Sequence, residues 1–113
     1  MKLLRIKADY TENNDEFIIF ILVIDDSGKL KTDVEMFGYV FDADEEGHYK
    51  DPFIIKPTYK KDFMILEYGT GRDYSTDKVN LPQKELKVGE YFTRWQNLTD
   101  EYSYIISHIE NII

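Results

Sequence analysis

Residues 17–24 form an unbroken run of eight apolar side chains, and this run restricts the fold more than any other feature of the chain. Its β-branched and aromatic content favours a strand, and a strand that is apolar on both faces lies in the interior of a sheet. The run is far shorter than the roughly 20 apolar residues that cross a bilayer as a helix. The sequence therefore predicts a buried central strand and no transmembrane helix.

The segments around this run have the pattern of short strands joined by turns. Residues 2–10 alternate between apolar and charged side chains, which indicates a half-buried strand. A turn at 25–29 is expected to lead into a returning strand at 34–41. Further strands are expected at 53–55, at 63–68 and after a turn within 88–95, whereas 74–81 is either an edge strand or an ordered loop. Residues 42–52 are interpreted as a long acidic loop.

The C-terminal segment has two interpretations. Tyr102, Ile105, Ile106 and Ile109 follow the spacing of an amphipathic helix. The composition of residues 102–107 is instead that of a strand, which would form a hairpin with the preceding one, and we favour this interpretation. The predicted fold is a single mainly β domain over residues 1–113, a small antiparallel barrel or sandwich of about seven short strands. A C-terminal helix, and with it an α+β fold, is the alternative.

The chain contains no cysteine, which excludes disulfides, thiolate metal sites and cysteine nucleophiles. Its first residues alternate charged and apolar side chains and lack the hydrophobic stretch of a secretory signal. We therefore expect a cytoplasmic protein of bacterial type, with no membrane association.

Negative charge is concentrated in one part of the sequence. The net charge is −8, and residues 9–51 hold thirteen acids against Lys29, Lys31 and Lys50. Such a field repels phosphate backbones, so nucleic-acid binding is disfavoured and a basic protein partner is favoured. The alternative is that the acids only keep a small domain soluble.

No motif in the chain specifies a reaction, a metal or a cofactor. Residues 42–47, Asp-Ala-Asp-Glu-Glu-Gly, resemble the start of a calcium loop, but the twelfth position, which should hold a bidentate acid, is Phe53. The only two histidines are His48 and His108, which are too far apart in sequence for a local metal motif. We predict no catalytic residues, no metal site, no cofactor and no enzymatic activity.

Nine tyrosines and one tryptophan exceed what a small core needs, and these residue types dominate protein interfaces. Those expected at the surface are Tyr49, Tyr59, Tyr68, Tyr74 and Trp95. The predicted partner-binding residues are Asp42, Asp44, Glu45, Glu46 and Tyr49, which together indicate a protein-binding module. An immunity protein or inhibitor that neutralises a basic toxin nuclease would present such an acidic, tyrosine-containing surface. The alternative is a small β-barrel that binds or transforms a small molecule in its mouth, lined by Tyr68, Trp95 or Glu67.

Overall fold

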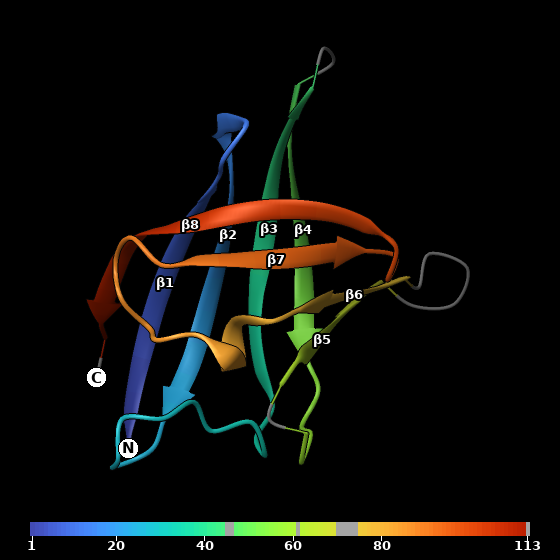
Figure 1. The fold of residues 1–113 in the computed structure, drawn as a ribbon. Helices are drawn as coiled ribbons and strands as arrows, with labels where there is room; N and C mark the ends of the chain where they lie inside the picture. Colours follow the sequence, from blue (N-terminus) through green and yellow to red (C-terminus); the bar gives the residue numbers. More distant parts are fainter. Residues whose placement is uncertain (45–46, 61, 70–74, 113) are drawn as a thin grey trace.

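The chain forms a closed barrel of antiparallel strands (Figure 1). The computed structural model describes residues 1–44, 47–60, 62–69 and 75–112. Each strand pairs with its neighbours in sequence, and the last strand returns to pair with the first. The strands are β1 (Lys2–Tyr10), β2 (Asn13–Ile24), β3 (Met36–Asp44), β4 (Gly47–Ile55), β5 (Met64–Tyr68), β6 (Ser75–Val79), β7 (Tyr91–Gln96) and β8 (Asp100–Asn111). The predicted mainly β barrel is confirmed, with eight strands in place of about seven.

The apolar run predicted as a central strand lies in β2, between β1 and β3. Its side chains alternate across the barrel wall, and Ile18, Phe20 and Leu22 are fully buried inside. Ile19 points to the outer face but is only 1 % exposed. The run is therefore covered on both faces at its centre, as its composition predicts.

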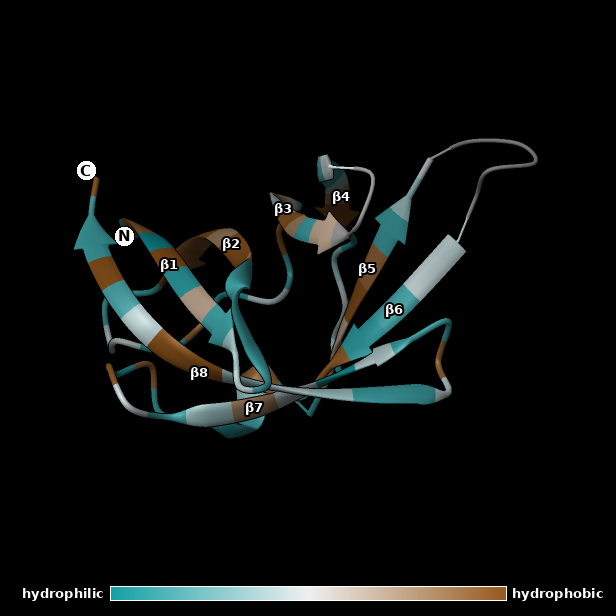
Figure 2. Ribbon diagram, turned by 90° about the horizontal axis from the view of Figure 1, so that it is seen from above, coloured by the Kyte–Doolittle hydropathy of each residue, from teal (hydrophilic) through white to brown (hydrophobic). Residues whose placement is uncertain are grey.

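The interior of the barrel is filled by side chains. Phe20 lies at its centre, with ring centroids 5.7 Å from Phe53 and 5.8 Å from Phe92. Around them pack aliphatic side chains from all the other strands except β7, which contributes Phe92, as apolar and polar residues alternate along the ribbons (Figure 2). Eight strands enclose a space that such side chains just fill, so the middle of the barrel is a packed core.

The C-terminal segment is a strand, which confirms the favoured interpretation. β8 pairs with β7 through Tyr91↔Ile105 and with β1 through Ile6↔Ile109. Tyr104 and Ile106 are buried inside the barrel, whereas Ser103, which precedes Tyr104, is exposed. A helix would leave β1 and β7 without a shared neighbour, and closing the barrel pairs the backbone groups of both.

The prediction of a long acidic loop over residues 42–52 is wrong. β3 continues to Asp44 and β4 begins at Gly47, so the segment is a hairpin in which Asp42 pairs with Tyr49 and Ala43 with His48. Figure 1 shows it projecting beyond the other strands of the barrel. Acids are poor strand formers, but the aromatic residues Tyr39 and Phe41 in β3 and Tyr49 in β4 strongly favour strands.

The up-and-down topology divides the connections between two ends. At one end, which we call the hairpin end, β1 joins β2, β3 joins β4, β5 joins β6 and β7 joins β8. The opposite end holds both termini and the longer connections, including the 3-10 helix η2 (Leu81–Gln83) (Figure 1). No helix in the described residues is long and apolar enough to span a membrane.

Candidate partner-binding surface at the hairpin end

Carboxylates from three hairpins gather at the hairpin end of the barrel. They lie at the β1–β2 turn, along both strands of the β3–β4 hairpin and at the start of β8, because each of these segments begins or ends there. The acids concerned whose side chains the structure describes are Glu12, Asp15, Glu16, Asp42, Asp51, Asp100 and Glu101. Residues far apart in sequence therefore lie at the same end of the barrel, and among them Glu16, Asp42 and Asp51 are close enough to interact electrostatically.

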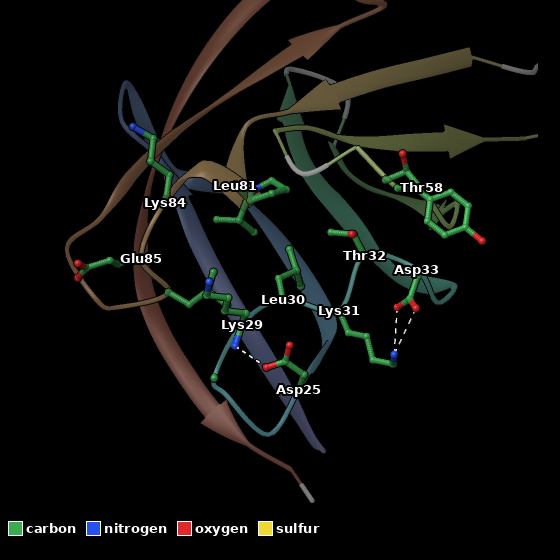
Figure 3. A pocket seen from close by; sticks show the side chains of 14 residues that line it. Asp25, Lys29, Leu30, Lys31, Thr32, Asp33, Thr58, Leu81, Lys84 and Glu85 are labelled. Carbon is green, nitrogen blue, oxygen red and sulfur yellow. Dashed lines mark hydrogen bonds and ion pairs between the residues drawn. The ribbon is translucent and has the colours of Figure 1, made fainter.

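At the opposite end of the barrel, lysine side chains lie among the acids. It contains a groove of about 800 Å³, lined by Lys29, Lys31 and Lys84 as well as by acids, above the apolar side chains of Leu30 and Leu81 (Figure 3). Acids there lie beside bases: Lys31 Nζ is 3.1 Å from Asp33, and Lys87 Nζ is 3.3 Å from Glu85. At the hairpin end, among the residues that the structure describes, Arg94 is paired with Asp77 and Lys50 lies 4.8 Å from the ring of Tyr39.

The structure brings together part of the predicted site. Asp42 and Tyr49 are directly opposite in the β3–β4 pair, so their side chains leave the same face of the hairpin. Tyr49 is 44 % exposed. Asp44 pairs with Gly47 at the tip, while Glu45 and Glu46 lie outside the described residues. Whether these residues bind a partner stays a prediction.

A cavity of about 510 Å³ opens at the hairpin end, and we call it the mouth cavity. Its walls come from β3, β4, β5, β6 and β7, whose inward-facing residues are apolar in the core and polar here. It is lined by Val40, Asp42, Asp51, Pro52, Tyr68, Gly69, Ser75, Asp77, Arg94, Gln96 and Asn97. Asp42 and Asp51 are diagonal neighbours on one face, since Asp51 pairs with Val40.

Carboxyl groups lie close together in the mouth cavity, and partial burial together with this proximity raises the pKa of one of them. Partial burial and a hydrogen bond with Asp51 raise the pKa of Asp42 to about 6, and Arg94 partly offsets the shift. Burial, together with the charge of Asp77, raises the pKa of Tyr68 above its usual range. Such a group of oxygens accepts hydrogen bonds and attracts a cation.

Two buried charged residues of the cavity wall, Arg94 and Asp77, were not predicted from the sequence. Arg94 and Asp77 are buried, and Arg94 Nη1 donates a 3.0 Å hydrogen bond to Asp77 Oδ2. The Arg94 guanidinium also lies 5.1 Å from the ring of Tyr102 and 5.7 Å from that of Tyr104. The available signal was the strand alternation, because Arg94 shares the buried face of β7 with Phe92.

The residues proposed for a small-molecule site divide between the two faces of the wall. Tyr68 lines the mouth cavity, and its side chain is half-buried with a buried hydroxyl, although it was expected at the surface. Whether a small molecule binds there stays a prediction. Trp95 lies on the outer face, where its ring is 5.9 Å from Phe63 and its Nε1 donates a hydrogen bond to Glu101. Glu67 pairs with the exposed Ile54, so it also points outward. Of the other tyrosines expected at the surface, Tyr59 is 94 % exposed and Tyr74 lies outside the described residues.

Comparison with known proteins returned no matching family model, no matching curated protein and no matching solved structure. The described residues also contain no group of three or more acidic or histidine side chains arranged to hold a metal ion.

Proposed function

We propose that the chain is a protein-binding module that uses its hairpin end to bind a basic protein partner. The observation that supports this proposal is the convergence of carboxylates from the β1–β2, β3–β4 and β7–β8 hairpins at one end of the barrel. A surface of one charge attracts an oppositely charged protein over a distance and accelerates association.

The class of partner follows from the same charge. A nuclease binds phosphates through lysine and arginine side chains, and an acidic protein surface competes for those side chains. We therefore propose a bacterial immunity protein or inhibitor that neutralises a toxin nuclease in the cytoplasm, which agrees with the absence of cysteine.

Tyr49 supplies the apolar part of the proposed interface. Its ring is 44 % exposed and leaves the same face of the hairpin as Asp42. An exposed tyrosine among charges loses few rotamers when a partner covers it, which is why this residue type concentrates at interface hot spots.

The proposal is tested by comparing the proteins retained from cell extract by two forms of the barrel. One is the natural chain, and the other carries Asp42→Asn, Asp44→Asn, Glu45→Gln and Glu46→Gln. A matched control changes acids at the opposite end, Asp33→Asn and Glu85→Gln, which lie in local ion pairs. We expect a basic protein on the natural chain and on the control, and little on the first variant. Equal retention by all three forms would contradict the proposal.

A further inference from the structure

One edge of β4 has no neighbouring strand where the β3–β4 hairpin projects from the barrel. β4 pairs with β3 along its whole length, whereas its pairing with β5 consists of Ile54↔Glu67 and Ile55↔Leu66. Beyond these pairs β5 turns away from β4 (Figure 1). Residues 48–52 are exposed, and no described residue pairs with the edge that faces β5. We call residues 48–52 the open edge.

The backbone N–H and C=O groups of His48 and Lys50 point toward the open edge. In an antiparallel pair, alternate residues direct these groups toward the neighbouring strand or away from it. Ala43, which lies opposite His48, donates its N–H to Glu16 Oε1 on the β2 side. Ala43 and His48 therefore form a non-hydrogen-bonded pair. By alternation, so do Phe41 and Lys50.

Pro52 agrees with this assignment and limits the open edge. It lies opposite Tyr39, two residues beyond Lys50, so the N–H that a proline lacks would also have pointed away from β3. A proline on an edge blocks pairing with another strand at its own position. His48 and Lys50, in contrast, offer both an N–H and a C=O group to an added strand.

We propose that the open edge binds an extended segment of the partner protein as an added β-strand. An extended chain carries N–H and C=O groups at the spacing of a strand edge, and strand addition is a common mode of peptide recognition. The mouth cavity provides room beside this edge, since Asp51 and Pro52 line one side of it and Tyr68 and Ser75 another. This inference rests on the proposed function, because it identifies how the partner binds at the hairpin end.

The side chains of the hairpin determine which segment fits. Tyr49 and Asp51 lie on the inner face of β4, beside Asp42 of β3, whereas His48 and Lys50 lie on the outer face. An added strand alternates in the same way, so its inward side chains should be basic and its outward side chains uncharged. A second copy of the chain fits less well, because its hairpin would bring further acids close to these carboxylates.

Amide hydrogen exchange, followed by NMR on the full chain, tests the open edge directly. The probe is the peptide acetyl-Thr-Lys-Val-Lys-Val-Lys-Thr-amide, which alternates basic and β-branched residues. At about ten times its dissociation constant, it should slow exchange of the His48 and Lys50 amides about tenfold. The Asp51 amide, which faces β3, should be protected with or without the peptide. Unchanged exchange at His48 and Lys50 would overturn the inference.

N-methylated forms of the same peptide test the pairing from the side of the ligand. Alternate amides of an added strand face β4, and the others face away from it. Methylation of one alternate set should weaken binding by more than about tenfold, and methylation of the other set by less than about twofold. Equal effects of the two methylated peptides would contradict strand addition, and this test uses the natural chain throughout.

Two variants at one position test the pairing from the side of the barrel. Lys50→Pro removes the backbone N–H together with the positive charge, and Lys50→Ala removes only the charge. The proline variant should bind the peptide about tenfold more weakly than the alanine variant. A proline should be accepted here as Pro52 is, and a protected Asp51 amide would show that the hairpin is intact. Equal binding by the two variants would overturn the inference.

The same measurements separate this inference from the proposed function. A peptide with glutamate in place of lysine should bind at least about tenfold more weakly, because its acids would face Asp42 and Asp51. Equal binding of the two peptides would remove the preference for a basic segment. If Lys50→Pro and Lys50→Ala bind equally and a basic protein still requires the hairpin-end acids, the proposed function stands and the open edge is removed from it.

Discussion

Arg94 and Asp77 form an ion pair inside the barrel wall, with Arg94 Nη1 3.0 Å from Asp77 Oδ2 and side chains that are 7 % and 3 % exposed. The second carboxylate oxygen of Asp77 accepts a 3.0 Å hydrogen bond from the backbone N–H of Asn97. Asp77 therefore ties β6 to the turn between β7 and β8. The β6–β7 ladder itself consists of Lys78↔Trp95 and Val79↔Arg94, so this side-chain contact extends a short pairing.

Breaking this pair from one side should strongly destabilise the fold. Asp77→Ala leaves a buried guanidinium without its counter-charge, and such changes cost about 3–5 kcal/mol. Asp33→Ala, which breaks the exposed Lys31–Asp33 pair, is the matched control and should cost less than about 1 kcal/mol. Urea unfolding followed by tryptophan fluorescence measures both. Similar urea midpoints for the two variants would show that the buried pair contributes no more to stability than the exposed pair.

The pH dependence of stability should reveal the raised pKa of Asp42. In the folded chain this pKa is about 6, against roughly 3.9 when unfolded. Between these values the folded state binds more protons, so the free energy of unfolding falls as pH rises from about 4 to about 6. Asp42→Asn should match the natural chain near pH 4 and be more stable at pH 7, by on the order of 1 kcal/mol because the side chain is partly exposed. A difference that does not change with pH would refute the assignment.

Gly38 is required by a close approach of β2 and β3. A Cβ atom at this position would lie 2.0 Å from the backbone oxygen of Ile19 and 2.7 Å from Cζ of Phe53. Gly38→Ala should therefore cost more than about 2 kcal/mol or prevent folding. Adding Phe53→Leu should not restore stability, because the nearest atom belongs to the backbone. Ser103→Ala, at an exposed strand position, should change stability by less than about 0.5 kcal/mol and serves as the control in thermal unfolding.

Calcium should leave the melting temperature unchanged. The position that would supply the bidentate acid of a calcium loop is Phe53, which is 3 % exposed in the core. The segment before it is the β3–β4 hairpin, whose register is that of two paired strands. A ligand at 100 times its dissociation constant would add about 2.7 kcal/mol, which calorimetry detects readily. A rise of several degrees in millimolar calcium would show that the hairpin tip binds the ion.

The strands that could be predicted are those whose pattern is local. β1 alternates from Leu4 to Tyr10, β2 is dominated by an apolar run, and the turn that follows contains Gly28 with a φ of 86°. In each case the side chains that identify the element are neighbours in sequence, and their period of two needs no knowledge of the rest of the fold.

The hairpin and the mouth cavity depend on contacts that a local pattern does not contain. Asp42 and Asp44 lower strand propensity, and only pairing with β4 shows that β3 continues through them. Asp77 and Arg94 meet because β6 and β7 pair over two residues, and nothing near either residue in sequence specifies that register. The acidic end likewise arises from topology, which brings Glu12, Asp42 and Asp100 to the same side.

The central claim is that the acids of the hairpin end guide a basic partner to the barrel. The most direct measurement is surface plasmon resonance of the basic protein that the natural chain retains, at low and moderate salt. The quadruple variant at Asp42, Asp44, Glu45 and Glu46 should stay folded, with a thermal midpoint at pH 7 no lower than that of the natural chain because Asp42→Asn is stabilising there. It should associate about tenfold more slowly and lose most of its salt dependence. Tyr49→Ala should instead speed dissociation, at a cost of about 2 kcal/mol. Unchanged association and dissociation in both variants would contradict the claim and leave these acids with a solubilising role alone.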